Sequence, residues 1–472
     1  MKIIKYLFLI LIISTQAFAT NRSDAEKPNI ILVLADDMSW FDVGAYHKMF
    51  DYVPKNAITP NIDKIAEEGM LFTRAFTATA MCGVTRQQLY TGIYPVRSGA
   101  YGNHTRVKEN TKSIAHYFRD LGYRVGLAGK GHIFPHKAFP FERVGKENKG
   151  PDGESSFGIE KTRKFMSRSK DPFLLIVASA NPHGPYTRGD RSQYPTDNLD
   201  IPSYLNDNKN LRHQMSSYLA EVTDLDREVG LLEEELNKLN IKENTIFIFT
   251  SEQGSSFPFG KWTTYDLGLQ TAFIIRWPKK IEANTITNAM IEYIDVVPTL
   301  TDLVNNTTPN DIDGLSFKEV LQGKKDKHKK YVYGIQTSLN IHHGNPYPIR
   351  SIRSEKYKLI HNLLPENNFS NAVTNSHSFK QEIKLERKSG EFNYINYIKR
   401  PEFELYDISK DPFERNNLYK NKDYDQIFSV LKKKLDQWMA QQGDEGIALE
   451  MKVCERMGFD IKNPSNACYK NL

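Results

Sequence analysis

The chain has 472 residues, of which 39% are hydrophobic and 25% charged, and its net charge is +6 at neutral pH. This length favours a large domain plus a smaller one over a single compact domain, and no internal repeat or low-complexity tract is present in the sequence. The small positive charge suits a polyanionic substrate. It is too weak, without a cluster of basic and aromatic residues, to indicate a nucleic-acid partner.

Residues 1–19 have the pattern of a secretory signal peptide. Lys2 and Lys5 make a basic start, residues 6–13 an apolar core, and residues 17–19 (AFA) a small-residue cleavage site. The apolar run is too short to cross a bilayer, and no later segment is long enough. The sequence therefore predicts an exported protein, periplasmic or secreted, without a stable membrane span. A leader that is not cleaved and acts as an anchor is the alternative.

Buried strands alternate with helices through the first part of the mature chain. The predicted strands cover residues 29–35, 123–128, 173–178, 245–250 and 273–277. The predicted helices run from Pro60 to a stop at Gly69, from Ser113 to Leu121 and from Gln214 to Leu239. Continuous apolar strands are typical of a parallel sheet that is covered on both faces. We therefore predict an α/β sandwich with a mainly parallel sheet over residues 20–345.

The pattern changes after about residue 320. Short strand-like segments lie at residues 331–336, 349–353, 357–361 and 403–406, and a helix is predicted near residues 424–441. The stretch 367–399 is polar and poorly patterned. We predict a smaller α+β domain with an antiparallel sheet over residues 346–472.

The three cysteines divide unevenly along the chain. Cys454 and Cys468 lie near the C-terminus, and an oxidising compartment would favour a disulfide between them. Cys82 has no partner in the N-terminal half. A single cysteine in an exported protein is either a buried spectator or a chemically special residue.

Polar side chains follow four of the predicted strands. They are Asp36 and Asp37, Lys130 and His132, Asn181 and His183, and Glu252 and Gln253. Each pair alone is weak evidence, because acidic pairs often lie in solvated turns and single histidines are often structural. Four strands of one sheet would nevertheless bring these side chains to a single edge. Two aspartates, a glutamate and an amide suit Ca²⁺ better than Zn²⁺, and no zinc or nucleotide motif is present.

The segment from Cys82 to Gly92, CGVTRQQLYTG, resembles the sulfatase signature, in which an arginine follows the cysteine by four positions and Leu-x-Thr-Gly comes next. Other matching pieces extend over the mature chain, among them NIILVLADD, GYRVGLAGKGH, ANPHGPY, IFIFTSEQG and ELYDISKDPFERNNL. Within the family the chain is most similar to heparan N-sulfatases (sulfamidases), through GAYGNH, GKGHIFPHKAFPFE and FPFGKWT. The resemblance implies the fold of the alkaline phosphatase superfamily.

The resemblance also implies how such a site works. A maturase oxidises the cysteine to formylglycine, whose hydrate offers two hydroxyls on one carbon. One hydroxyl attacks sulfur, and the other then loses its proton so that sulfate leaves and the aldehyde returns. By matching positions, one Ca²⁺ would be held by Asp36, Asp37, modified Cys82, Glu252 and Gln253.

The remaining roles follow from the same matching positions. Arg86 would orient the hydrate, Lys130 and His132 would contact its hydroxyls, and His132 would be the base for sulfate release. His183 would donate a proton to the leaving oxygen or nitrogen, and Lys261 would bind sulfate oxygens. His104 is a weaker candidate for substrate contact, with a structural role as the alternative.

Two positions depart from the family pattern. Val84 stands where the maturase usually reads proline, which bears on whether Cys82 is oxidised. Glu252-Gln253 replaces the usual Asp-Asn or Asp-His pair, with side chains one methylene longer than Asp or Asn. A degraded metal site in an inactive relative is the alternative.

We expect an enzyme that hydrolyses O-sulfate esters, or N-sulfamates, on a sulfated polysaccharide or oligosaccharide such as an algal glycan or a glycosaminoglycan. The competing hypotheses are a phosphodiester or phosphonate monoester hydrolase of the same superfamily and a non-catalytic binder of sulfated glycans. Specificity is expected in the loops at residues 134–152, 186–207 and 338–347.

Overall fold

The computed structural model describes residues 27–339, 341, 345–389 and 393–457. The predicted signal peptide at residues 1–19 and Cys468 lie outside the described residues, so the leader and the disulfide with Cys454 stay predictions. Among the residues described, no helix combines the length and apolarity needed to cross a membrane.

The larger sheet is built around β1 (Asn29–Ala35). Its strand order is β4-β3-β5-β1-β6-β7-β2-β8, with β9 also paired to β2. The other strands are β2 (Met70–Phe76), β3 (Arg124–Gly129), β4 (Glu142–Arg143), β5 (Phe173–Ala178), β6 (Thr245–Ser251), β7 (Gln270–Arg276), β8 (Thr285–Thr287) and β9 (Ile291–Glu292). All pairings are parallel except those that β7 makes with β6 and β2. The predicted mainly parallel sheet is confirmed.

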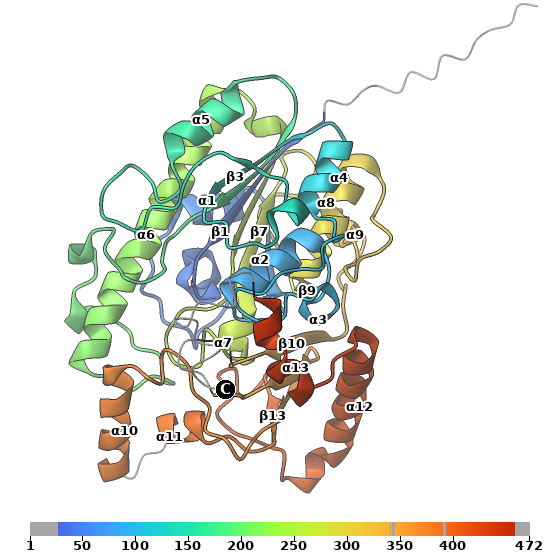
Figure 1. Ribbon diagram of the computed structural model, residues 1–472. Helices are drawn as coiled ribbons and strands as arrows, with labels where there is room; N and C mark the ends of the chain where they lie inside the picture. The colour runs from blue at the N-terminus through green and yellow to red at the C-terminus, as the bar shows by residue number, and fades with distance from the viewer. Residues whose placement is uncertain (1–26, 340, 342–344, 390–392, 458–472) are drawn as a thin grey trace, which may run out of the picture.

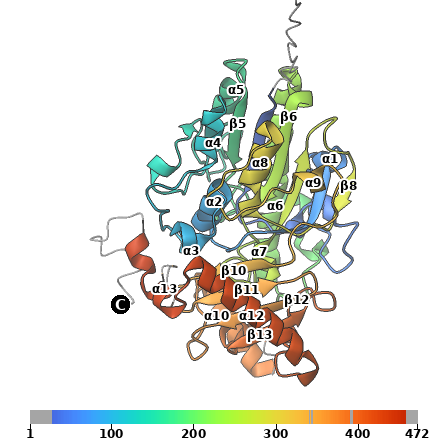
Figure 2. The same cartoon turned by 90° about the vertical axis from the view of Figure 1, so that its right-hand side faces the viewer.

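Helices cover both faces of this sheet (Figures 1 and 2). The first face carries α1 (Pro60–Glu67), α5 (Ile159–Ser167) and α6 (Lys209–Lys238), and the second carries α2 (Cys82–Thr91), α4 (Ile114–Asp120), α8 (Val296–Asn305) and α9 (Lys318–Leu321). On β1, Ile31 and Val33 pack on the first face and Ile30 and Leu32 on the second. Because both faces are buried, β1 has no polar residue after Asn29, which explains the continuous apolar sequence from Ile30 to Ala35.

The second sheet is antiparallel, as predicted. It consists of β10 (Val332–Gln336), β11 (Ile349–Arg353), β12 (Tyr357–Asn362) and β13 (Phe403–Asp407), in that order. The predicted domain boundary at residues 345 and 346 stays a prediction, and β10 of this sheet precedes it. Short helices α3 (Pro95–Ser98), α7 (Asp266–Leu269) and α13 (Ile447–Met451) lie in the connections and the C-terminal segment.

The second sheet is also covered on both faces. Helix α12 (Asp425–Gln442) lies against one face (Figure 2), where its Leu435 and Trp438 share a core with Ile352 and Leu359. On the other face Ile349 and Ile360 join the core of the large sheet. Two further helices, α10 (His377–Ser389) and α11 (Asn393–Ile398), occupy the stretch whose sequence is poorly patterned. The shared core fixes the C-terminal part against the large sheet.

A buried ion network reinforces this junction. Asp266, at the start of α7, lies 2.7 Å from the Arg353 guanidinium on β11 and 2.7 Å from the Lys358 ammonium on β12. Burial opposes ionisation of Asp266, but Arg353 and Lys358 nevertheless hold its pKa below the ordinary value. The ionised carboxylate therefore stabilises the fold above the unfolded-state pKa, and this contribution is lost as the pH falls through the lowered folded-state pKa.

Asp266→Ala is expected to lower the free energy of unfolding by about 3–5 kcal/mol at neutral pH, because two buried cations lose a counter-ion. Urea unfolding measures the change, and the difference from wild type should shrink as the pH falls below about 4. Asp311→Ala is the matched control, since Asp311 is 94% exposed in its pair with Arg97. Equal stability of Asp266→Ala and wild type at neutral pH would contradict this role of the network.

Candidate active site

The carboxyl ends of four adjacent strands form one edge of the large sheet. Asp36 and Asp37 follow β1, Lys130 follows β3, Asn181 follows β5 and Glu252 follows β6. The Asp36 amide donates to the Asn181 carbonyl at 2.9 Å, and the Glu252 amide donates to the Ala35 carbonyl at 2.9 Å. The polar groups that the sequence placed after four separate strands thus lie together in space.

Cys82 is the first residue of α2 and points into this cluster. Its Sγ lies 3.7 Å from Asp36 Oδ1, 3.8 Å from Asp37 Oδ1 and 3.3 Å from Gln253 Nε2. No side chain caps this helix end, so the positive end of the helix dipole lies at Cys82. Only 4% of Cys82 is exposed.

The surroundings of Cys82 disfavour its thiolate. Burial, with the neighbouring Glu252 and Asp37, raises its pKa far above the ordinary value, although Lys130 and Lys261 act in the opposite direction. A thiol becomes a nucleophile as the thiolate, which this site disfavours. An unmodified Cys82 is therefore badly suited to attack a substrate.

Three buried carboxylates are matched by three buried cations. Lys130 Nζ lies 2.5 Å from Asp36 Oδ2, and Lys261 Nζ lies 2.6 Å from Asp37 Oδ2. Arg86, one helical turn after Cys82, forms an ion pair with Glu252 and donates to the Lys130 carbonyl at 2.9 Å. Because these charges balance, a bound divalent cation would make the site net positive and complementary to an anion.

The pKa shifts follow from this pairing. Burial opposes ionisation of Asp36, but Lys130 and His183 hold its pKa well below the ordinary value. For Lys130 and Lys261, burial acts against the charged form, yet the aspartates raise the pKa of both ammonium groups. The aspartates and lysines therefore stay charged at neutral pH.

The donor set fits a hard divalent cation. Asp36, Asp37, Cys82 and Glu252 each offer a ligand atom, and these atoms lie within 4.8 Å of one another. The buried Oε1 of Gln253 has no hydrogen-bond partner, which is costly unless the atom binds an ion or a ligand. Carboxylate and amide oxygens are the ligands that Ca²⁺ and Mg²⁺ prefer.

His132 and His104 form a pair beside the first turn of α2. His132 Nε2 lies 2.7 Å from His104 Nδ1, and a Cβ at Gly83 would lie only 3.0 Å from His132 Nε2. Burial, reinforced by Lys130, lowers the pKa of both rings, to about 4 for His104 and well below the ordinary value for His132. Both rings are therefore neutral at neutral pH, and His132 can accept a proton.

His183 lies on the accessible side of the cluster. Its Nε2 is 3.6 Å from Asp37 Oδ2, its Nδ1 is 2.7 Å from the Gly184 carbonyl oxygen, and its side chain is 25% exposed. A group leaving toward solvent would pass this imidazole.

Two further polar residues reach the cluster and were missed in the sequence. Ser256 Oγ donates to Asp37 Oδ2 at 2.7 Å, and Lys149 Nζ lies 3.3 Å from His183 Nδ1. Ser256 stands between Gln253 and Lys261, and Lys149 stands in the loop 134–152 that was expected to set specificity. The only sequence signal for a role of these two residues in the site was their position in these segments.

A mainly parallel sheet with this cluster at its carboxyl edge has the architecture of alkaline phosphatase-type hydrolases. Residues 28–306 match the family described as Sulfatase, and residues 254–372 and 374–441 match the family described as N-sulphoglucosamine sulphohydrolase, C-terminal. The chain therefore belongs to the sulfatase family and is a sulfuric ester hydrolase. The predicted resemblance to sulfamidase-like bacterial sulfatases is confirmed.

Individual relatives agree over most of the chain. An "Ulvan-active sulfatase" of Formosa agariphila is 35% identical over 436 residues, covering 89% of this chain and 81% of the relative. The human "N-sulphoglucosamine sulphohydrolase" is 26% identical over 487 residues, covering 91% and 93%. A solved structure of a protein "in complex with its substrate D-Glucosamine-2-N, 6-O-disulfate" has a TM-score of 0.66 at 20% identity, and the match covers 89% of this chain and 99% of that one.

Addition of a divalent cation to metal-stripped protein is expected to raise the melting temperature. A ligand at 100 times its dissociation constant stabilises the folded state by about 2.7 kcal/mol. Differential scanning fluorimetry with Ca²⁺, Mg²⁺ or EDTA reads the shift.

Gln253→Leu should largely abolish this cation response, because it removes the unpaired amide oxygen and keeps the side-chain volume. Gln193→Leu, on an exposed part of the surface, is the control and should respond as wild type does. An unchanged response in Gln253→Leu would place the cation elsewhere.

Proposed function

We propose that the chain is an exported, Ca²⁺-dependent sulfatase that removes sulfate from a sulfated polysaccharide or oligosaccharide, with formylglycine made from Cys82 as nucleophile. The observation that carries the proposal is the placement of Cys82 at the start of α2, within 3.8 Å of both aspartates. Export is supported by the signal-like residues 1–19, and a glycan substrate is supported by the names of the relatives.

The cation would be held by Asp36, Asp37, Glu252, Gln253 and an oxygen of modified residue 82. The replacement of Asp-Asn by Glu252-Gln253 keeps the same oxygen donors, and both side chains reach the cluster despite their extra methylene. When bound, a divalent cation supplies positive charge that favours ionisation of a nearby hydroxyl and offsets the charge of the sulfo group.

Oxidation of Cys82 to formylglycine would provide a nucleophile in place of a thiol whose thiolate is disfavoured. Formylglycine hydrate supplies two hydroxyl oxygens where the structure has one sulfur, so Cys82 Sγ stands in for one of these oxygens. The required partner is a maturase that oxidises the cysteine before or during folding, because Cys82 is buried in the folded chain. Both hydroxyls would lie beside the carboxylate cluster.

The surrounding cations bind and orient the anionic group. Lys130 and Lys261 already reach the two aspartates, so a sulfate seated at Cys82 would share the same ammonium groups. Arg86 is fixed by Glu252 and the Lys130 carbonyl, and it fixes the acidic side of the site in turn. These groups do not have to move when charge develops, which is the condition for strong electrostatic stabilisation.

Two histidines divide the proton transfers. His183 Nδ1 is within hydrogen-bond distance of the Gly184 carbonyl, so the protonated ring would keep its Nδ1 proton there and give the proton on Nε2 to the leaving oxygen or nitrogen. His132 is neutral and lies against the first turn of α2, so we assign to its ring the role of the base that takes the proton a hydroxyl of residue 82 must lose before sulfate departs. His104, in contact with His132, orients that ring.

Co-expression with a maturase is expected to yield an aldehyde at residue 82, detected by mass spectrometry of the tryptic peptide, together with sulfate release from fragments of ulvan, carrageenan or heparan. Cys82→Ala should reduce turnover by about 10³-fold or more. Val84→Pro should raise the aldehyde fraction, because it restores the proline that the maturase usually reads at this position. The fold should tolerate it, since Val84 occupies the first turn of α2, where proline loses no helical hydrogen bond. Wild-type protein that carries aldehyde but cleaves bis-aryl phosphate faster than every sulfate would favour a phosphodiesterase.

His183→Gln is expected to lower kcat/KM on sugar sulfates by about 10²–10⁴-fold, the usual contribution of a general acid. With an aryl sulfate the loss should be much smaller, because a phenolate leaves without a proton. The exposed His213→Gln on α6 is the control. A similar loss on both kinds of sulfate would show that His183 does not protonate the leaving group.

A further inference from the structure

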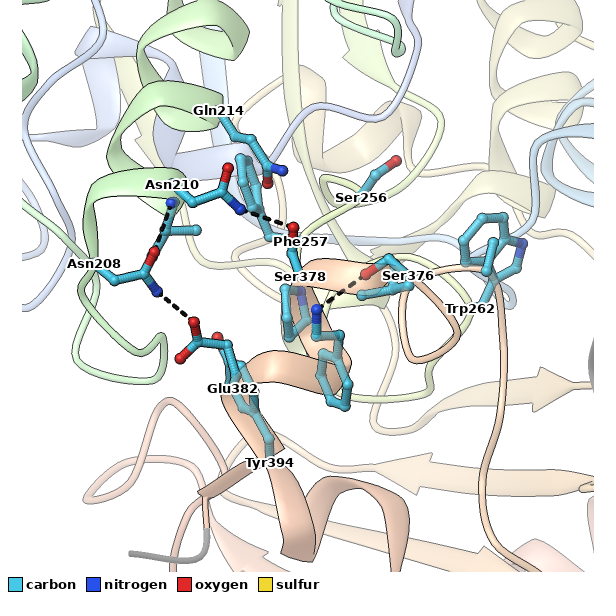
Figure 3. A pocket seen from close by; sticks show the side chains of 15 residues that line it. Asn208, Asn210, Gln214, Ser256, Phe257, Trp262, Ser376, Ser378, Glu382 and Tyr394 are labelled. Atoms are coloured by element: carbon cyan, nitrogen blue, oxygen red, sulfur yellow. Dashed lines mark hydrogen bonds between the residues drawn. The ribbon is translucent and has the colours of Figure 1, made fainter. Parts of the chain in front are cut away.

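A cavity of about 320 Å³ lies beside the carboxylate cluster. Its walls come from the beginning of α6, from the loop 256–262 after β6, and from the C-terminal segments at 372–382 and Tyr394 (Figure 3). This volume is at the lower end of the range of small-molecule sites, enough for a single ring rather than a chain. None of its lining residues was among the candidate site residues of the sequence.

Hydrogen bonds between α6 and α10 hold the far wall in place. Asn210 Nδ2 donates to Ser378 Oγ at 2.8 Å, and Asn208 Nδ2 donates to Glu382 Oε1 at 2.9 Å (Figure 3). The aromatic ring of Tyr394 stacks on Phe379 at 4.7 Å between centroids. The cavity is therefore formed before any ligand arrives.

The near wall belongs to the active site. Ser256 lines the cavity and donates to Asp37 Oδ2, and the ring of Trp262 lies 4.9 Å from Lys261 Nζ. The Trp262 amide also donates to the carbonyl of Ala80, two residues before Cys82, at 3.0 Å. Ser256 and Trp262 therefore lie between the carboxylate cluster and the cavity.

The lining combines aromatic faces with neutral polar groups. Phe257, Trp262, Phe379 and Tyr394 supply the rings, and asparagine, glutamine and serine side chains supply amides and hydroxyls. Gln214 is exposed, and its side chain faces the cavity (Figure 3). A sugar ring has apolar faces, which can pack on aromatic rings, and hydroxyl groups around its edge, which can bond to amides and hydroxyls. The lining therefore complements a sugar.

The charge of the lining is negative. Glu382 is its one ionisable carboxylate, and no lysine, arginine or histidine is among the described residues that line the cavity. A carboxylate or a second sulfate in this cavity would face Glu382 without a counter-charge, which is unfavourable. The charge of this lining is therefore opposite to that of the side chains at Lys130 and Lys261, which are cationic.

We propose that this cavity is a subsite for an uncharged sugar ring linked to the ring that carries the sulfate. The subsite rests on the proposed function and specifies it further. The enzyme then prefers a sulfated unit flanked by a neutral sugar over the same unit flanked by a uronate or a second sulfated ring.

A pair of synthetic sulfated disaccharides tests the subsite. They share the sulfated ring, and the neighbouring ring is either glucose or glucuronate. For wild type, kcat/KM is expected to be at least about 10-fold higher with glucose, a difference of about 1.4 kcal/mol.

Gln214→Lys should reduce that ratio by about 10-fold, because it adds a cation to the cavity at an exposed helix position where folding is not at risk. Glu382→Gln should reduce it in the same direction by removing the carboxylate. Gln381→Lys on α10, which adds the same charge outside the lining, should keep the wild-type ratio. Gln381→Lys should also cleave the sulfated monosaccharide as wild type does.

Calorimetric binding of the same disaccharides to Cys82→Ala separates the two proposals. Tighter binding of the glucose compound, lost in Gln214→Lys, supports the subsite even if wild type releases no sulfate and the proposed function fails. Equal binding and cleavage of both disaccharides, or a wild-type preference for glucuronate, would overturn the subsite while leaving sulfate release intact.

Discussion

The structure depends on the balance of buried charge at the carboxyl end of β1. Asp36, Asp37 and Glu252 are fully buried and are tolerated because Lys130, Lys261 and Arg86 are buried against them. Unpaired, any one of these charges would cost several kcal/mol. The same arrangement gathers the ligand atoms for a divalent cation beside the cationic side chains that suit an anion, so the charge balance that permits the fold also defines the chemistry.

Much of the fold could be predicted because burial on both faces leaves a strong pattern. The strand 29–35 was located to the residue, since Ile30 to Ala35 are each buried in one of the two cores that cover the sheet. The start of α6 was missed by five residues, because the cap is the Asn208 side chain, which accepts from the Leu211 amide outside the apolar pattern. The reversed direction of β7 and the two helices within 367–399 depend on tertiary contacts, as in the packing of Phe259 on Tyr397, and leave no local signal.

The sequence could predict those site residues that directly follow a buried strand or belong to a recognisable motif. Each polar pair alone was weak evidence, but pairs after four strands of one sheet pointed to a shared edge, which singled out Asp37 and Gln253. Ser256 and Lys149 were missed because a serine or lysine in a loop has no distinctive pattern. The cavity beside Trp262 could not be predicted, since its C-terminal wall at residues 372–394 follows the loop 256–262 by more than one hundred residues and is joined to α6 by tertiary hydrogen bonds.

The most direct test of the account is a crystal structure of maturase-treated protein grown with Ca²⁺ and an unreactive sulfate analogue, with anomalous scattering to locate the ion. The account requires one ion that contacts Asp36, Asp37, Glu252, Gln253 and an oxygen of residue 82, with the sulfo group between Lys130 and Lys261. An ion bound elsewhere, or an intact thiol at residue 82 turned away from the aspartates, would contradict it.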